Sequence, residues 1–86
     1  MKICYKTNGT CSRMIDLEVE NNKILNVRFT GGCNGNLQGI AKLVEGMDAD
    51  AVIRRLEGIH CGSRSTSCPD QLSKALRSIK NEEVEV

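Results

Sequence analysis

The spacing of apolar residues changes once along this chain, near residue 31, and that change constrains its fold more than any other feature. Before it, apolar and polar residues alternate over 2–7, 13–20 and 24–30, the period of two that indicates half-buried strands. After it, apolar residues recur three and four apart, the period that indicates helices packed by one side. Strands first and helices afterwards predict an α+β fold.

Short turns join the three strand segments. Asn8-Gly9-Thr10 turns the chain after the first, and Asn21-Asn22-Lys23 is typical of a hairpin turn because asparagine tolerates positive φ. The expected inward side chains are Ile3, Tyr5 and Thr7; Ile15, Leu17 and Val19; and Leu25, Val27 and Phe29. One apolar and one polar side per strand predict a three-stranded antiparallel β-meander with one wet face.

Three helical stripes follow, made of Leu37, Ile40, Ala41 and Val44; of Ala49, Val52, Ile53 and Leu56; and of Leu72, Ala75, Leu76 and Ile79. A single apolar stripe per helix predicts three helices packed on one face of the sheet. We expect Gly46 and Gly58 to end the first two helices and Asp48 to cap the second.

The third helix is expected to begin at Ser67 or Cys68. Pro69 suits a first helical turn, and the charge of Asp70 complements the positive end of the helix dipole. Residues 82–86 are expected to form a loose tail, and residues 1–86 a single domain.

The composition and charge of the chain exclude some classes of binding partner. The 86 residues carry 12 basic and 11 acidic side chains, with one Tyr, one Phe and no Trp, so neither a basic footprint nor a stacking platform for DNA or RNA is present. We see no signal peptide and no apolar run of membrane-spanning length, and therefore expect a cytoplasmic protein. A domain this small gains from a metal or a second subunit, and an edge strand near its N-terminus is compatible with a homodimer.

Three of the five cysteines lie at expected element boundaries: Cys33, Cys61 and Cys68. In a reducing compartment, this many thiols favour metal or redox use over structural disulfides. A thiol at a helix N-terminus has a lowered pKa, so Cys33 and Cys68 are expected to hold more thiolate than a free cysteine. Cys4, between two lysines on the wet face, is expected to be an exposed bystander, and Cys11, in a turn, is a weaker candidate than the three boundary cysteines.

These cysteines suggest a metal site if the loops at 31–36 and 58–68 share one edge of the sheet. Cys33, Cys61 and Cys68 with His60 would make a set of three cysteines and one histidine, which suits structural zinc, and a more open set would suit an iron–sulfur centre. The spacing does not contain two C-x-x-C pairs, so three reduced thiols packed as small apolar residues is the alternative.

The glycine-rich segment admits a phosphate-binding interpretation. Gly32, Asn34 and Gly35 lead into the first helix, where backbone N–H groups can cradle an anion. The alternative is a sharp strand-to-helix turn, because the segment matches neither G-x-G-x-x-G nor a P-loop. No Ser/His/Asp set or paired carboxylates stand out, so no catalytic residue is predicted.

The chain resembles the TSCPD domain family over about residues 3–80. The motifs that carry the resemblance are Thr66-Ser67-Cys68-Pro69-Asp70 with the Gln71-Leu72 that follows, Gly31-Gly32-Cys33-Asn34-Gly35-Asn36-Leu37, Leu43-Val44-Glu45-Gly46-Met47, and Cys61-Gly62. That family occurs as small free-standing proteins and as a C-terminal region of adenosylcobalamin-dependent (class II) ribonucleotide reductases. The resemblance implies a link to ribonucleoside-diphosphate reduction and deoxynucleotide supply. Since this chain lacks the large catalytic barrel, adenosylcobalamin would enter only through a partner reductase.

A second likeness runs to iron–sulfur scaffold proteins of the IscU/NifU type. Cys33 and the pair His60-Cys61 match that family in order and context. The scaffold's further cysteine between the first two helices is missing here, where the chain reads Glu45-Gly46-Met47-Asp48. Three functions thus stay open: an accessory module of ribonucleotide reductase with a cysteine-based metal or redox site, an iron–sulfur scaffold or carrier, and a nucleotide- or protein-binding module without chemistry.

Overall fold

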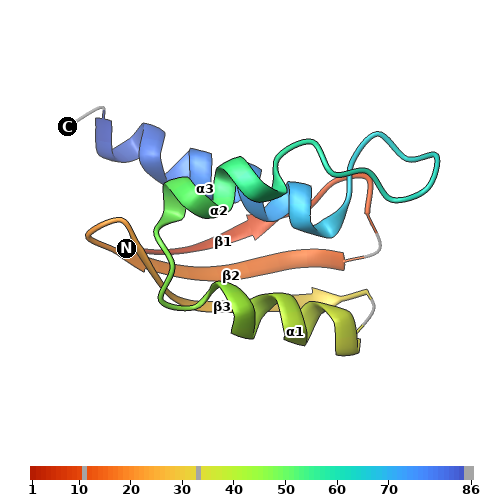
Figure 1. Cartoon of the computed structure of the whole chain (residues 1–86), viewed down its shortest axis with the longest axis horizontal. Coiled ribbons are helices and arrows are strands. Elements are labelled where there is room, and N and C mark those ends of the chain that lie inside the picture. Colours follow the sequence, from red (N-terminus) through yellow and green to blue (C-terminus); the bar gives the residue numbers. More distant parts are fainter. Residues whose placement is uncertain (11, 33, 85–86) are drawn as a thin grey trace.

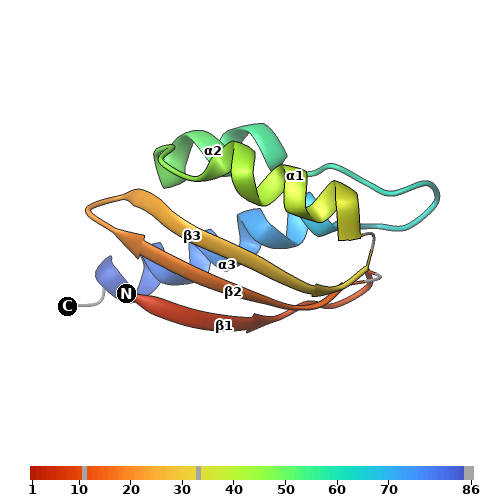
Figure 2. The same cartoon turned by 90° about the horizontal axis from the view of Figure 1, so that it is seen from below.

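A computed structural model of the chain describes residues 1–10, 12–32 and 34–84. Three strands come first, β1 (Lys2–Lys6), β2 (Ser12–Glu20) and β3 (Lys23–Gly31), followed by α1 (Asn34–Val44), α2 (Ala49–Leu56) and α3 (Cys68–Val84). The strands form one antiparallel sheet in the order β1-β2-β3. All three helices lie on one side of it (Figure 1, Figure 2), which confirms the predicted α+β meander with helices on one face.

The hairpin between β2 and β3 has the predicted turn. Asn21 and Asn22 have φ values of 51° and 65°, and Glu20 pairs with Lys23 across the two-residue loop. Two successive positive φ values match the right-handed twist of the flanking strands, and asparagine adopts them at small cost. This turn therefore sets the pairing of β2 with β3 at the start of the hairpin.

The predicted inward position of Leu25 is wrong. Val19 pairs with Ile24 and Glu18 pairs with Asn26, so one extra residue of β3 forms a β-bulge at this point. The bulge shifts the alternation by one position: Ile24 is fully buried, whereas 47% of Leu25 is exposed. Beyond the bulge, Val27 and Phe29 face the helices as predicted.

The first two helices end and begin where the sequence predicted. Gly46 and Gly58 lie just beyond α1 and α2 with φ values of 86° and 84°. Asp48 occupies the N-cap position of α2, but its side chain makes no capping hydrogen bond. Its carboxylate instead lies 2.9 Å from Lys23 Nζ, because the segment before α2 pairs with the start of β3.

The third helix continues three residues into the segment expected as a tail, since α3 ends at Val84. Apart from Leu37, the predicted apolar stripes of the three helices pack with the sheet in one core, which includes the fully buried side chains Ile15, Ile24, Leu72 and Leu76. α2 packs beside α3, and α1 lies along β3 (Figure 1). Within the described ranges, no helix combines the length and apolarity needed to cross a membrane.

Candidate functional site

Asp70 is the centre of a buried polar corner at the start of α3. Its Oδ1 atom accepts a hydrogen bond from the Gly58 backbone N–H at 2.8 Å, and its Oδ2 atom accepts one from the Thr66 hydroxyl. Lys74, one turn along α3, places its Nζ atom 3.6 Å from Oδ2. The carboxylate thus joins the end of α2 to the start of α3.

These contacts determine the charge of Asp70. Burial alone raises the pKa of its carboxyl, but the hydrogen bonds from Thr66 and Gly58 and the positive charge of Lys74 outweigh that effect. The net pKa is therefore lower than the usual value, and the group is ionised at neutral pH. A buried charge with several donors is a strong structural contact.

Ser67 and Gln71 extend the corner to other parts of the chain. The Ser67 hydroxyl accepts a bond from the Asp70 backbone N–H at 3.1 Å, as an N-cap residue does, and donates to the Ile59 carbonyl at 2.6 Å. The Gln71 side chain donates to the Thr66 hydroxyl and accepts from the Asn8 backbone N–H. Three segments distant in sequence are thereby held together.

Cys68, in the middle of this corner, is buried, with 8% of its surface exposed. Its sulfur lies 3.1 Å from the Ser12 hydroxyl at the start of β2. The same cysteine lines a cavity of about 390 Å³, here called the thiol cavity. Its lining consists of Thr10, Asn36, Leu37, Ile40, Cys61, Arg64, Ser67, Cys68 and Pro69.

Cys61 reaches the thiol cavity from the loop before α3. Its backbone N–H donates to the Thr66 carbonyl at 3.2 Å, and its carbonyl accepts from the Arg64 N–H at 3.0 Å. This local turn returns the chain towards Cys68. Cys61 itself is exposed, so one of the two thiols is open to solvent while the other is covered.

The structure thus places two of the four predicted metal ligands, Cys61 and Cys68, in the lining of one cavity. His60 is exposed and does not line the thiol cavity, and Cys33 lies outside the described residues, as does Cys11. Among residues 1–10, 12–32 and 34–84, no three His, Cys, Asp or Glu side chains are arranged to hold a metal ion.

The glycine-rich segment forms a sharp turn into α1. Gly31 and Gly32 have φ values of 83° and 76°. A Cβ atom on Gly32 would lie 2.9 Å from Leu37 Cδ1 and 3.2 Å from the Ser12 backbone nitrogen, so close packing requires glycine there. Asn34 begins α1, and a Cβ on Gly35 would meet nothing.

Cys4 lies on the other face of the sheet. Desolvation, together with a hydrogen bond to Asp16 and the negative charge of that carboxylate, raises the pKa of the Cys4 thiol. An exposed thiol that is protonated at neutral pH, on the face opposite the helices, has no part in the thiol cavity.

Sequence reasoning missed the polar partners of the corner. In the sequence, Thr66, Ser67 and Gln71 stand out only as parts of a motif or a helix start, although all three are buried and hydrogen-bonded. Ser12 had no local signal, because its partner Cys68 is 56 residues away in the sequence. Arg64 lies in a loop, where no periodic pattern of apolar residues indicates which side chains face the cavity.

The fold and this corner define a small α+β domain whose last helix starts in a hydrogen-bonded pentapeptide beside a thiol cavity. The chain belongs to the TSCPD domain family, whose model matches residues 2–80. The family is found in ribonucleotide reductases. Comparisons with curated proteins and with solved structures gave no significant match.

Proposed function

We propose that this chain is a cytoplasmic accessory module of ribonucleotide reduction with a cysteine-based metal or redox site at the thiol cavity. The observation that carries the proposal is the shared exposure of Cys61 and Cys68 to one cavity, on a fold that belongs to a family found in ribonucleotide reductases. The other two ligands that the sequence predicts are Cys33, which lies outside the described residues, and His60, which is exposed and does not line the cavity.

The chemistry of the thiol cavity supports soft-metal or dithiol use. Cys61 and Cys68 both line the cavity, and Arg64 and Pro69 at the start of α3 line it with them. Bound zinc would cross-link the loop at 58–67 to α3 and stabilise a small domain, whereas an iron–sulfur centre would carry electrons. Without metal, the same thiols would cycle between dithiol and disulfide by thiol–disulfide exchange with a redox partner protein, whose own disulfide is reduced as this one forms.

The test is elemental analysis of protein purified anaerobically without added metal, with Cys61→Ser, Cys68→Ser and Cys33→Ser beside the wild type. We expect about one zinc or iron site per chain in the wild type and its loss in the three variants. Cys4→Ser is the matched control and should keep the metal, because Cys4 lies on the other face of the sheet. Absence of metal, with melting unaffected by chelator, would contradict the metal site.

The rival functions give other results. An iron–sulfur scaffold, after anaerobic reconstitution with iron and sulfide, should show visible absorption that depends on Cys33. A nucleotide-binding module using Gly32, Asn34 and Gly35 should melt at a higher temperature with millimolar ATP or dATP, because a ligand of the folded state stabilises it by mass action. Protein that stays colourless and shows no shift excludes both.

The link to ribonucleotide reduction is tested separately. A class II ribonucleotide reductase that lacks its own TSCPD region is mixed with this chain, and co-elution and turnover are measured. We expect the two proteins to form a complex and the reductase to turn over faster in it. Adenosylcobalamin should bind to the reductase and not to this chain. Failure to bind or to change turnover would contradict the accessory role and leave the metal question open to its own test.

A further inference from the structure

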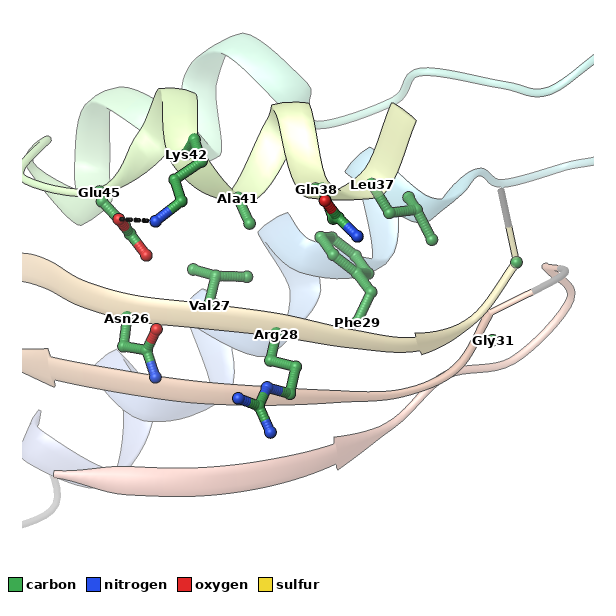
Figure 3. Close-up of a pocket in the computed structure, with 11 residues that line it drawn as sticks. Asn26, Val27, Arg28, Phe29, Gly31, Leu37, Gln38, Ala41, Lys42 and Glu45 are labelled. Atoms are coloured by element: carbon green, nitrogen blue, oxygen red, sulfur yellow. Dashed lines mark ion pairs between the residues drawn. The ribbon is translucent and has the colours of Figure 1, made fainter. Parts of the chain in front are cut away.

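A second cavity runs along the outer edge of the sheet, between β3 and α1 (Figure 3). Its volume is about 620 Å³, and we call it the edge groove. Val27, Phe29, Leu37 and Ala41 form its apolar wall, and Figure 3 shows Val27 and Phe29 pointing towards α1. Polar side chains flank it on both sides: Asn26 and Arg28 from β3, and Gln38, Lys42 and Glu45 from the α1 side.

The edge groove exposes backbone groups of β3 that have no partner strand. Val19 of β2 exchanges two hydrogen bonds with Met1, so its backbone points towards β1. Consecutive residues of a strand point their backbone groups to opposite sides, so the even-numbered residues of β2 bond to β3. Their register partners are Asn26, Arg28 and Thr30. The N–H and C=O groups of Val27 and Phe29 therefore point outward, into the groove.

The chain already makes backbone hydrogen bonds at the start of this edge, to the turn that follows α1. The Ile24 N–H donates to the Met47 carbonyl at 3.0 Å, and the Ile24 carbonyl accepts from the Gly46 N–H at 2.7 Å. Ile24 thus shows the outward geometry expected at Val27 and Phe29. For those two, no such bond is made within the described part of the chain.

The two edges of the sheet differ in their protection. β1 carries Lys2 and Lys6, and lysines along an edge discourage strand addition. β3 carries no lysine or proline from Asn26 to Thr30, and its bulge lies earlier, at Leu25. The open stretch of β3 is therefore the edge suited to an added strand.

The shape of the edge groove favours a bare strand over a second copy of this chain. Paired strands lie about 4.8 Å apart, whereas packed helices need about 8–10 Å between axes. Lys42 and Glu45 line the groove from the α1 side, so α1 forms the wall that faces an added strand. A second β3 would bring its own α1 into that space.

The charged side chains around the edge groove determine which kind of added strand it favours. Arg28 and Lys42 lie on opposite sides of the groove, against the single acid Glu45, which pairs with Lys42 at 3.9 Å. Arg28 makes no ion pair with any described residue, and its side chain points to the wet face (Figure 3). An acidic side chain on an added strand would lie directly beside it.

We propose that the edge groove binds an extended, acidic segment of a partner protein as a fourth strand beside Val27–Phe29. Main-chain hydrogen bonds to Val27 and Phe29 hold the segment. Its apolar side chains enter the groove under α1, and an acidic side chain neighbours Arg28. The proposal is independent of the thiol cavity and of any metal.

The test uses two synthetic peptides, acetyl-Thr-Val-Glu-Val-Glu-Val-Thr-amide and its counterpart with lysine at both glutamate positions. Binding is followed by fluorescence anisotropy of labelled peptides, and amide hydrogen exchange by NMR. We expect the acidic peptide to bind about twofold to fivefold tighter, the range of one cross-strand charge pair. At saturation, the amides of Val27 and Phe29 should exchange at least about tenfold more slowly.

Two variants of the full chain sharpen the test. Arg28→Glu should reverse the preference to the lysine peptide, whereas Lys6→Glu, the same charge change on β1, should leave it unchanged. Binding without protection at Val27 and Phe29, no binding of either peptide, or a preference unaffected by Arg28→Glu would each overturn the proposal. So would a dimer in light scattering that is lost in Val27→Pro, because a second copy would then occupy the edge.

Discussion

At the scale of single residues, Asp70 does the most to hold this domain together. Its buried carboxylate accepts hydrogen bonds from the loop after α2 and from the Thr66 hydroxyl. The backbone N–H of Asp70 donates to the Ser67 hydroxyl. The pentapeptide that names the family is therefore a structural corner as well as the setting of Cys68. Substitutions of its hydrogen-bonded residues should therefore lower the stability of the fold, whatever chemistry Cys68 performs.

Asp70→Asn is expected to lower the free energy of unfolding by about 2–3 kcal/mol at pH 7, because charge-assisted hydrogen bonds in a buried site are lost. Urea denaturation measures this. Glu57→Gln, which removes the exposed ion pair between Glu57 and Arg77, is the control and should cost less than about 1 kcal/mol. Equal losses in the two variants would contradict the central place given to Asp70.

The stability contributed by Asp70 should depend on pH. Because its pKa is lower in the folded state than in the unfolded state, the contribution is complete above the unfolded value near 3.8 and is lost as pH falls through the lower folded value. The difference in unfolding free energy between wild type and Asp70→Asn should therefore shrink on acidification below about pH 4. A difference that is constant from pH 7 to pH 3 would argue that Asp70 is not ionised in the fold.

The two thiols of the cavity should react at different rates. Cys61 is exposed, whereas Cys68 is covered and contacts Ser12, so a maleimide should label Cys61 at least about tenfold faster in folded protein. Peptide mapping by mass spectrometry separates the sites. Both should react alike in denaturant. Fast labelling of Cys68 in native protein would contradict its buried position.

At the scale of elements, glycine has opposite roles in α1 and just after it. Gly39 lies within the helix, where a Cβ would meet nothing, whereas Gly46 has a φ of 86° that L-residues rarely adopt. Gly39→Ala should stabilise the protein by about 0.5–1 kcal/mol, and Gly46→Ala should destabilise it by about 1 kcal/mol or more. Thermal unfolding measures both. Changes of the same sign would contradict the placement of the helix end.

The elements also show where periodicity stops being informative. A pattern of two predicts which side chains of a regular strand face inward, but the bulge at Leu25 arises from how β3 pairs with β2. Ile24 and Leu25 are both apolar, so neither choice violates the pattern. Ile24 is the buried residue of the two because of the hairpin turn at Asn21-Asn22 and because the segment at 46–49 forms hydrogen bonds with Ile24.

At the scale of the whole molecule, one small core carries the stability. Leu76 is fully buried at the centre of α3, whereas 78% of Leu43 on α1 is exposed. Leu76→Ala should lower the free energy of unfolding by about 2–5 kcal/mol, a large part of what a domain of this size possesses. Leu43→Ala should change it by less than about 0.5 kcal/mol. A large effect at Leu43 would indicate that α1 packs against another surface in solution.

The sequence by itself determined the order of strands and helices, the two-asparagine turn, the helix ends at Gly46 and Gly58, and the apolar stripes. These are local properties, since backbone preference and periodicity act over a few residues. Only the tertiary structure decided that Ser12 meets Cys68, that Cys61 and Cys68 share one cavity, and that Val27 and Phe29 leave backbone groups open beside α1. Such contacts join residues distant in the chain, and no local pattern encodes the distance between them.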